Sequence, residues 1–167
     1  MYHQIISRCA QQLEHLSIFL DKAEAFAAAK RFDPNVFLYE RLAPDMYPLL
    51  SQIQAACDYA KGGAAHLSGR TPPRHHDGER TIDEARVRIL ETLAFMRSLT
   101  REDFEGAAER SVRLPWKAEP IRADDYLLQV VFPNVYFHAG VAYSILRKGG
   151  VDLGKLDFLG EIYRDER

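Results

Sequence analysis

The chain has 167 residues, of which 47% are hydrophobic and 28% are charged, and its formal net charge is −2. That length is enough to bury a core, so we expect one domain over residues 1–167. Interspersed charge argues against nucleic acid or an anionic membrane as a partner, and no apolar run approaches the roughly 18 residues of a membrane span. The amino terminus lacks the uninterrupted apolar core of a signal peptide, which predicts a cytoplasmic protein.

The cysteine pattern indicates a structural role for both thiols. Cys9 and Cys57 lie far apart in the sequence and in neither a CxxC nor a zinc-type spacing. We therefore expect two reduced, buried thiols and no disulfide between them.

The first segment predicts a long helix from Tyr2 to about Ala29. Its end is marked by Asp33-Pro34, because the residue before a proline is kept out of the helical region. The following stretch, which contains Pro44 and Pro48, is interpreted as a packed connector. The predicted helix carries apolar residues at alternating steps of four and three, namely Tyr2, Ile6, Cys9, Leu13, Leu16, Leu20 and Ala23.

A second helix is predicted to begin between Asp45 and Pro48 and to end before Gly69. Beside its apolar stripe lies a polar ridge, which consists of Gln54, Asp58 and Lys61. One interpretation of the ridge is a solvated face with an intrahelical Asp58–Lys61 pair. The other is that it faces the fourth helix and orients a histidine there. The apolar stripe itself contains Met46, Leu49, Ile53, Cys57, Ala60, Ala64 and Leu67.

Residues 69–80 are rich in proline, glycine and charge, which predicts a surface loop with His75 and His76 exposed to solvent. Thr81 and Glu84 then have the spacing of a capping box, so a third helix is expected from Thr81 to about Leu99.

The segment before the fourth helix is expected to be irregular. The run from Thr100 to Asp103 resembles a second helix cap and predicts a short helix through Phe104 to about Glu109, followed by a hairpin or an irregular segment over residues 111–122. Trp116, the single tryptophan, lies in this segment. We expect it either to pack, to lie in an interface or to cover a pocket at the end of the helices.

The fourth helix is predicted to start around Ala123 to Asp125 and to stop at Gly149-Gly150, with a kink at Pro133. His138 lies in the middle of its apolar face, and Asn134 lies one turn earlier on nearly the same face. Burying either side chain without a partner would cost roughly 1–3 kcal/mol, so both are candidate functional residues. The tail after Gly150 is expected to be extended. The apolar face contains Leu127, Val131, Val135, Ala142 and Ile145.

Three stretches carry a resemblance to a known family: LAPDMYPLLSQIQAACDYAKGGAAHLSG, TIDEARVRILETLAFMRSL and FPNVYFHAGVAYSILRKGGVDLGKLDFLG. They resemble the DUF1993 family, an uncharacterised group within the DinB/YfiT-like superfamily, over essentially the whole chain. The resemblance implies an all-α, up-and-down four-helix bundle, often dimeric. In the superfamily it also implies a metal held by one histidine of the second helix and an H-x-x-x-H pair of the fourth.

Laid against that pattern, Asn134 stands in place of the first histidine of the pair, and His138 stands at the second. The second helix has no histidine at mid-length, because His66 lies near its far end. No metal is therefore expected. A divalent ion, if bound, would use His138 with Asp58 or Asp45.

Two functions follow from these residues. The first is a small-molecule binding protein or transferase-like enzyme, whose metal site is degenerate. The alternative is a non-catalytic homodimer that acts through protein–protein interaction, in which His138 is a core imidazole paired with Asn134, Gln54 or a backbone carbonyl. The pocket expected for the first function is lined by His138, Asn134, Gln54, Asp58, Lys61 and Trp116.

Overall fold

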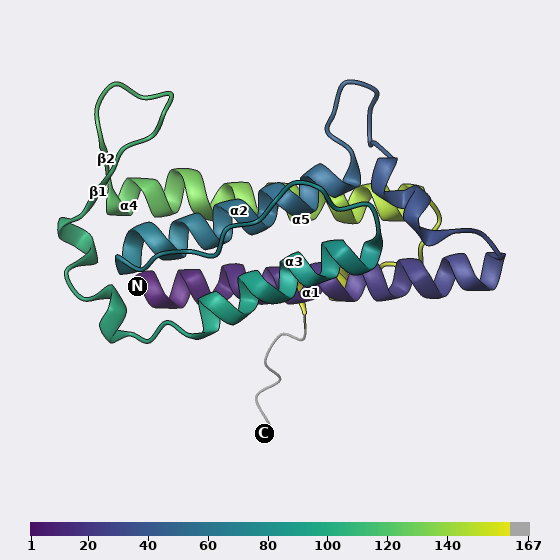
Figure 1. Cartoon of the computed structure of the whole chain (residues 1–167), viewed down its shortest axis with the longest axis horizontal. Coiled ribbons are helices and arrows are strands. Elements are labelled where there is room, and N and C mark those ends of the chain that lie inside the picture. Colours follow the sequence, from purple (N-terminus) through teal and green to yellow (C-terminus); the bar gives the residue numbers. More distant parts are fainter. Residues whose placement is uncertain (161–167) are drawn as a thin grey trace.

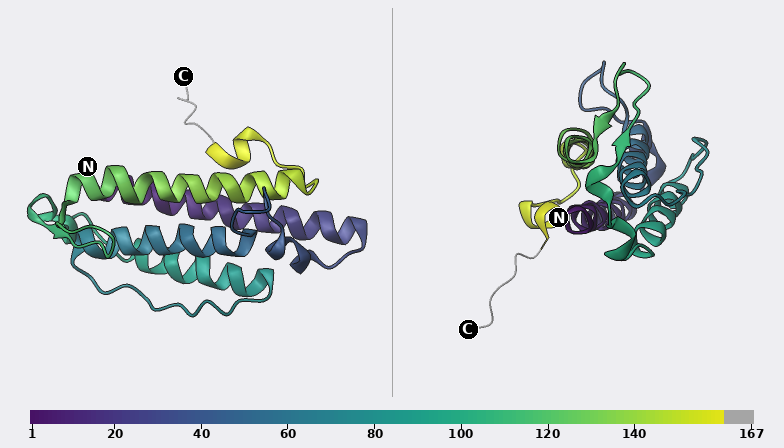
Figure 2. Two further views of the ribbon diagram at one scale, coloured as in Figure 1. Left: turned by 90° about the horizontal axis from the view of Figure 1, so that it is seen from above. Right: turned by 90° about the vertical axis from the view of Figure 1, so that its left-hand side faces the viewer.

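The computed structural model describes residues 1–160 and is mostly helical (Figure 1). Its long helices lie side by side along the longest axis of the molecule (Figure 2). α2 contacts α5, α1 and α3, and α1 also contacts α3 and α5. A single apolar core therefore runs between them. The long helices are α1 (Tyr2–Lys30), α2 (Leu49–Ser68), α3 (Ile82–Arg97) and α5 (Phe132–Lys148).

The predicted apolar stripes form this core. On α1, Leu13, Leu16 and Leu20 are fully buried, and each such side chain contributes about 1.5–3 kcal/mol by leaving water. On α2 the inward positions include Ala56 and Ala60, whose small side chains allow neighbouring helices to approach closely.

Two helix boundaries differ from those predicted. α2 begins at Leu49, because Pro48 has an extended backbone and occupies the position before the first turn. Asp45 therefore lies outside the helix. α3 ends at Arg97, short of Leu99, but its capping box is confirmed: the Glu84 amide donates to Thr81 Oγ1, and the Thr81 amide donates to Glu84 Oε2, each at 3.1 Å.

The segment between α3 and the last long helix contains short elements. The predicted helix up to Glu109 is instead two 3₁₀ turns, η2 (Glu102–Phe104) and η3 (Ala107–Glu109). Gly106 lies between them with a φ of 67°, a left-handed conformation that stops a continuous helix. β1 (Ser111–Val112) then pairs antiparallel with β2 (Ile121–Arg122), so the hairpin alternative is correct and the fold is not purely α-helical.

The fourth predicted helix is continuous but not uniform. α4 (Ala123–Asp125) leads into six residues of π-helix, η4 (Tyr126–Val131), and then into α5. The wider turns lie immediately before Pro133, which has no amide hydrogen to donate to the preceding turn. A kink was predicted at this proline, and what the helix shows there is a run of π turns.

Two further segments are also helical, one between α1 and α2 and one after α5. η1 (Pro34–Tyr39) is a 3₁₀ segment after α1, and α6 (Lys155–Leu159) is a short helix where an extended tail was predicted. Phe158 anchors α6 by stacking against Phe19 and by an edge contact with Tyr143. The rest of the predicted tail, residues 161–167, lies outside the described residues.

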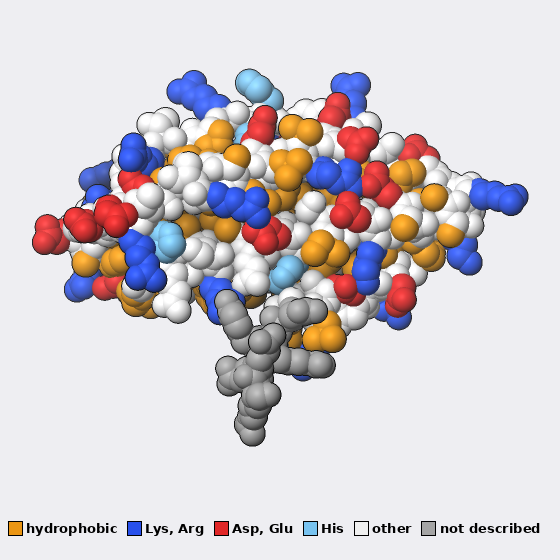
Figure 3. All heavy atoms as spheres, turned by 90° about the horizontal axis from the view of Figure 1, so that it is seen from below, with side chains coloured by type: hydrophobic (Ala, Val, Ile, Leu, Met, Phe, Trp, Pro, Cys, Tyr) orange, Lys and Arg blue, Asp and Glu red, His pale blue; other side chains and the backbone are white. Residues whose placement is uncertain are grey.

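Within residues 1–160, no helix combines the length and hydropathy needed to cross a bilayer. The face shown in Figure 3 carries acidic and basic side chains side by side, as the interspersed charges of the sequence predict.

α2 and the π segment approach each other closely at Gly63, and this contact can be tested by substitution. A Cβ atom added there would meet the Val131 methyl carbons, one of them at 2.7 Å, whereas at Gly62 the nearest atom would be the Tyr126 hydroxyl at 3.9 Å. We expect Gly63→Ala to lower the free energy of unfolding by about 1–3 kcal/mol. The matched Gly62→Ala should raise it by about 1 kcal/mol, because alanine favours a helix. Urea denaturation of both variants measures the difference; equal stabilities would contradict the close approach.

Candidate functional site: the imidazole between α2 and α5

His138 projects from α5 towards α2 and is half-buried. Its Nδ1 lies 2.7 Å from Oε1 of Gln52, which is only 2% exposed. The amide nitrogen of Gln52 donates in turn to the backbone carbonyl oxygen of Tyr47, at 3.0 Å. A chain of hydrogen bonds therefore runs from the connector before α2, through Gln52, to the imidazole.

Two aromatic side chains contact the same ring. Tyr59 stacks on His138 with a centroid distance of 5.7 Å and an interplanar angle of 16°, and Phe137 meets its edge at 5.2 Å. Burial lowers the pKa of His138 below its ordinary value, which favours the neutral ring at neutral pH. No described residue forms a hydrogen bond with Nε2, and this atom is not among the buried polar atoms without a partner. Nε2 therefore contacts solvent.

Asn134 has a different role from the one predicted. Its Nδ2 donates to the Val130 carbonyl oxygen at 2.7 Å, within its own helix. The π turns end at this point, so the amide satisfies a backbone group there and does not pair with His138. Asn134 and His138 are both half-buried, not fully buried as their place on the apolar stripe suggested.

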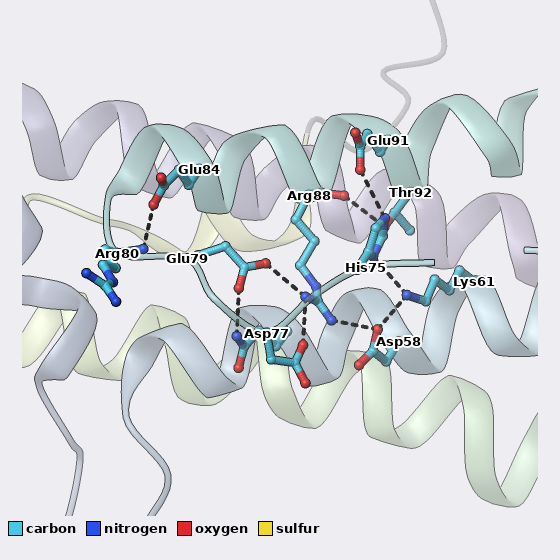
Figure 4. Close-up of polar contacts among 11 residues, drawn as sticks. Asp58, Lys61, His75, Asp77, Glu79, Arg80, Glu84, Arg88, Glu91 and Thr92 are labelled. Carbon is cyan, nitrogen blue, oxygen red and sulfur yellow. Dashed lines mark hydrogen bonds and ion pairs between the residues drawn. The ribbon is translucent and has the colours of Figure 1, made fainter. Parts of the chain in front are cut away.

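The polar ridge of α2 faces α3 and the loop that precedes it, and its partners do not include His138 (Figure 4). Gln54 donates to Glu79 Oε2 at 2.9 Å, and Asp58 forms ion pairs with Lys61 at 2.9 Å and with Arg88 at 2.8 Å. The residues expected to line one pocket are thus divided between two sides of α2. Trp116, expected in the same pocket, is 68% exposed in the β1–β2 hairpin.

Arg88 is the centre of the polar cluster on this second side. Its side chain is 3% exposed and contacts three carboxylates: Asp58 and Glu79 at 2.8 Å and Asp77 at 2.9 Å. Burial opposes the charge on Arg88, but the hydrogen bonds that it donates to Glu79, Asp58 and Asp77 outweigh burial and raise its pKa. Because Asp77 and Glu79 belong to the connection between α2 and α3, Arg88 ties that connection onto both helices.

The side chain of His75, in the same connection between α2 and α3, is buried, although it was predicted to be exposed. It is 3% exposed, and its Nδ1 accepts a hydrogen bond from Lys61 Nζ at 2.8 Å. Its Nε2 lies 3.3 Å from Glu91 but forms no hydrogen bond with it. Burial, followed by the charges of Lys61 and Arg88, lowers the pKa of His75. Only His76 of the pair is exposed, as predicted.

Both cysteines are free and buried, as predicted. Burial raises the pKa of each thiol to about 12, so neither is present as a reactive thiolate at neutral pH. These residues belong to the core and not to a site.

The comparisons with known proteins agree with the helical arrangement. The family model described as a domain of unknown function, DUF1993, matches residues 1–159. The chain belongs to the DUF1993 family. A crystal structure at 1.83 Å of a DinB family member protein from Shewanella denitrificans superimposes with a TM-score of 0.92 and 39% sequence identity. The match covers 98% of this DUF1993 chain and 94% of that one. No curated protein matches.

The metal implied by the DinB/YfiT-like superfamily does not fit the residues of this DUF1993 protein. Nε2 of His138 is the one imidazole nitrogen of the pattern left open, because Nδ1 pairs with Gln52; at the other positions Asn134 is a poor ligand and donates to a backbone carbonyl, and Asp58 pairs with Arg88 and Lys61. His66 is exposed near the end of α2, and Asp45 is exposed before it. Nowhere in residues 1–160 do three or more His, Cys, Asp or Glu side chains gather as a metal site would require.

Two residues of this DUF1993 chain were missed by sequence reasoning, although each carried a signal. Arg88 lies between the inward positions Ala85 and Thr92, and a charged residue on a buried face needs buried partners. Gln52 lies four residues before the buried Ala56. The buried face of α2 is therefore wider than the single apolar stripe that we assumed.

The stability of the Arg88 cluster is open to direct test. We expect Arg88→Gln to lower the free energy of unfolding by about 3 kcal/mol, because it leaves the buried carboxylate of Glu79 without its cation. The control is Arg97→Gln, which removes an exposed pair with Glu14 and should cost under about 1 kcal/mol. Denaturant unfolding provides the comparison, and equal losses in the two variants would show that Arg88 is not the structural tie.

Proposed function

We propose that this DUF1993 protein is a DinB-like up-and-down four-helix bundle that binds a small molecule, or acts as a transferase-like enzyme, on the face shared by α2 and α5. The observation that carries the proposal is the state of His138: one ring nitrogen is held by Gln52, while the other has no hydrogen-bond partner within residues 1–160 and is not buried by them. A lone pair at this nitrogen gives a ligand an acceptor to bind.

The surroundings of the ring support binding of an organic ligand. Tyr59 and Phe137 present aromatic area beside the imidazole, and Phe137 is exposed. A neutral imidazole can accept a hydrogen bond or a proton from a bound group, which is the chemistry of a general base. The proposed binding does not use the metal of the superfamily. The free thiols of Cys9 and Cys57 are in keeping with a cytoplasmic protein.

Binding at His138 can be tested with a library of small neutral and charged fragments, observed by ¹H–¹⁵N NMR of the full chain. We expect shifts of the resonances of Gln52, Tyr59 and His138 that His138→Gln abolishes. The matched variant His76→Gln, which removes an exposed histidine of the loop, should leave them unchanged. Fragments that bind only in the hollow of about 310 Å³ beside Tyr2 and Phe104, or none that bind, would contradict the proposal.

The second candidate is a non-catalytic homodimer, and one feature of α3 favours it. Val87 and Leu90 are each 52% exposed on the outer side of this helix, and the exposed Ala94 continues the row one turn further on. An apolar row at helical spacing suits a second copy of the same helix.

We expect Leu90→Lys to shift a dimer towards monomer in sedimentation velocity, because it places a charge in the centre of the row. The matched control is Leu128→Lys, which changes an equally large exposed side chain on η4. A wild-type protein that sediments as a monomer at high concentration would remove this candidate.

A further inference from the structure

The amide of Gln52 has only one orientation that pairs both of its ends. Its nitrogen donates to the Tyr47 carbonyl oxygen, an atom that can only accept. Rotating the amide by half a turn would set its own oxygen against that carbonyl and leave two acceptors facing each other. Gln52 is 2% exposed, so water cannot readily compensate, and an unpaired buried group costs about 1–3 kcal/mol. Oε1 must therefore point at His138.

That orientation determines which nitrogen of His138 carries the proton. Oε1 of Gln52 lies 2.7 Å from Nδ1 and accepts only, so Nδ1 must be the donor. A neutral imidazole has one N–H, and Nε2 is then left with its lone pair. The same nitrogen is the one that contacts solvent.

We infer that Gln52 is a positioning residue that holds His138 with its proton on Nδ1, so that the site takes a ligand with a neutral hydrogen-bond donor, such as a hydroxyl or a thiol. Nε2 accepts that donor's hydrogen, while Nδ1–H stays on Gln52. An anion such as a carboxylate or phosphate finds no hydrogen to accept at Nε2. The ligand class rests on the proposed function; the position of the proton does not.

The electrostatics of the site point the same way. Burial alone lowers the pKa of His138, and no described charged side chain contributes to the shift. The nearest described partners of the ring are an amide and two aromatic side chains. No cation among them is available to compensate the desolvation of an anionic ligand.

The proton position can be read directly by long-range ¹H–¹⁵N NMR of the uniformly ¹⁵N-labelled full chain above neutral pH. For His138 we expect a protonated, pyrrole-type Nδ1 and an unprotonated, pyridine-type Nε2. Gln52→Leu should shift the signals towards the other tautomer. The matched Gln54→Leu removes an amide on the other side of α2, which pairs with Glu79, and should change nothing at His138. A proton on Nε2 in the wild-type protein would overturn the inference, even if Gln52→Leu failed to fold.

The ligand class is tested by titrating the same sample with three probes of matched shape: benzyl alcohol, phenylmethanethiol and benzoate. We expect at least one of the two neutral donors to move the His138 Nε2 resonance and benzoate to leave it in place; the response of the alcohol against the thiol separates the two donor types. Benzoate binding at His138 as well as the neutral probes would overturn the ligand class. If none of the three probes moves the His138 resonances, both the ligand class and the proposed function are contradicted. The role of Gln52 is tested separately by the tautomer spectra.

Discussion

Most polar side chains that leave water find partners inside the protein, and such pairs organise both sides of α2. On one side Arg88 gathers Asp58, Asp77 and Glu79, which ties the α2–α3 connection to the helices. On the other side Gln52 joins a backbone carbonyl to the imidazole of α5. On the first side the carboxylates neutralise the buried guanidinium, although Arg88 Nε and His75 Nε2 are buried there without a hydrogen bond, whereas on the second side the unpaired nitrogen, His138 Nε2, is not buried. That difference is why we assign structure to the Arg88 side and binding to the His138 side.

The long helices could be predicted because their information is local. Apolar residues at helical spacing, the Thr81–Glu84 capping box and the glycines after α2 and α5 each act within a few residues of sequence. The π turns of η4 could be predicted only as an irregularity, because a proline reveals a missing donor but not how the preceding turns adjust. α6 depends on its contact with Phe19, more than a hundred residues away, which no local pattern discloses.

The site was predicted less well, for a related reason. Helical periodicity places a residue on a face, but it does not say which neighbour that face meets. His138 was correctly placed towards α2, yet its partner is Gln52 and not Gln54, two residues further along and on a different side of the helix. His75 was predicted to be exposed from the composition of its loop, whereas its side chain is buried against Lys61 and Glu91, two residues outside that loop. Asn134 was expected to need a partner, and its own helix supplies one.

The hairpin bears on how this protein can be studied in solution. Trp116 is the sole indole in the chain and stands largely in water, remote from the apolar interior. Its fluorescence will resemble that of a denatured chain even when the helices are intact, and quenchers will reach it in both states. An optical assay of unfolding should therefore rely on helical circular dichroism, and a change in tryptophan emission would instead signal an encounter at the hairpin itself.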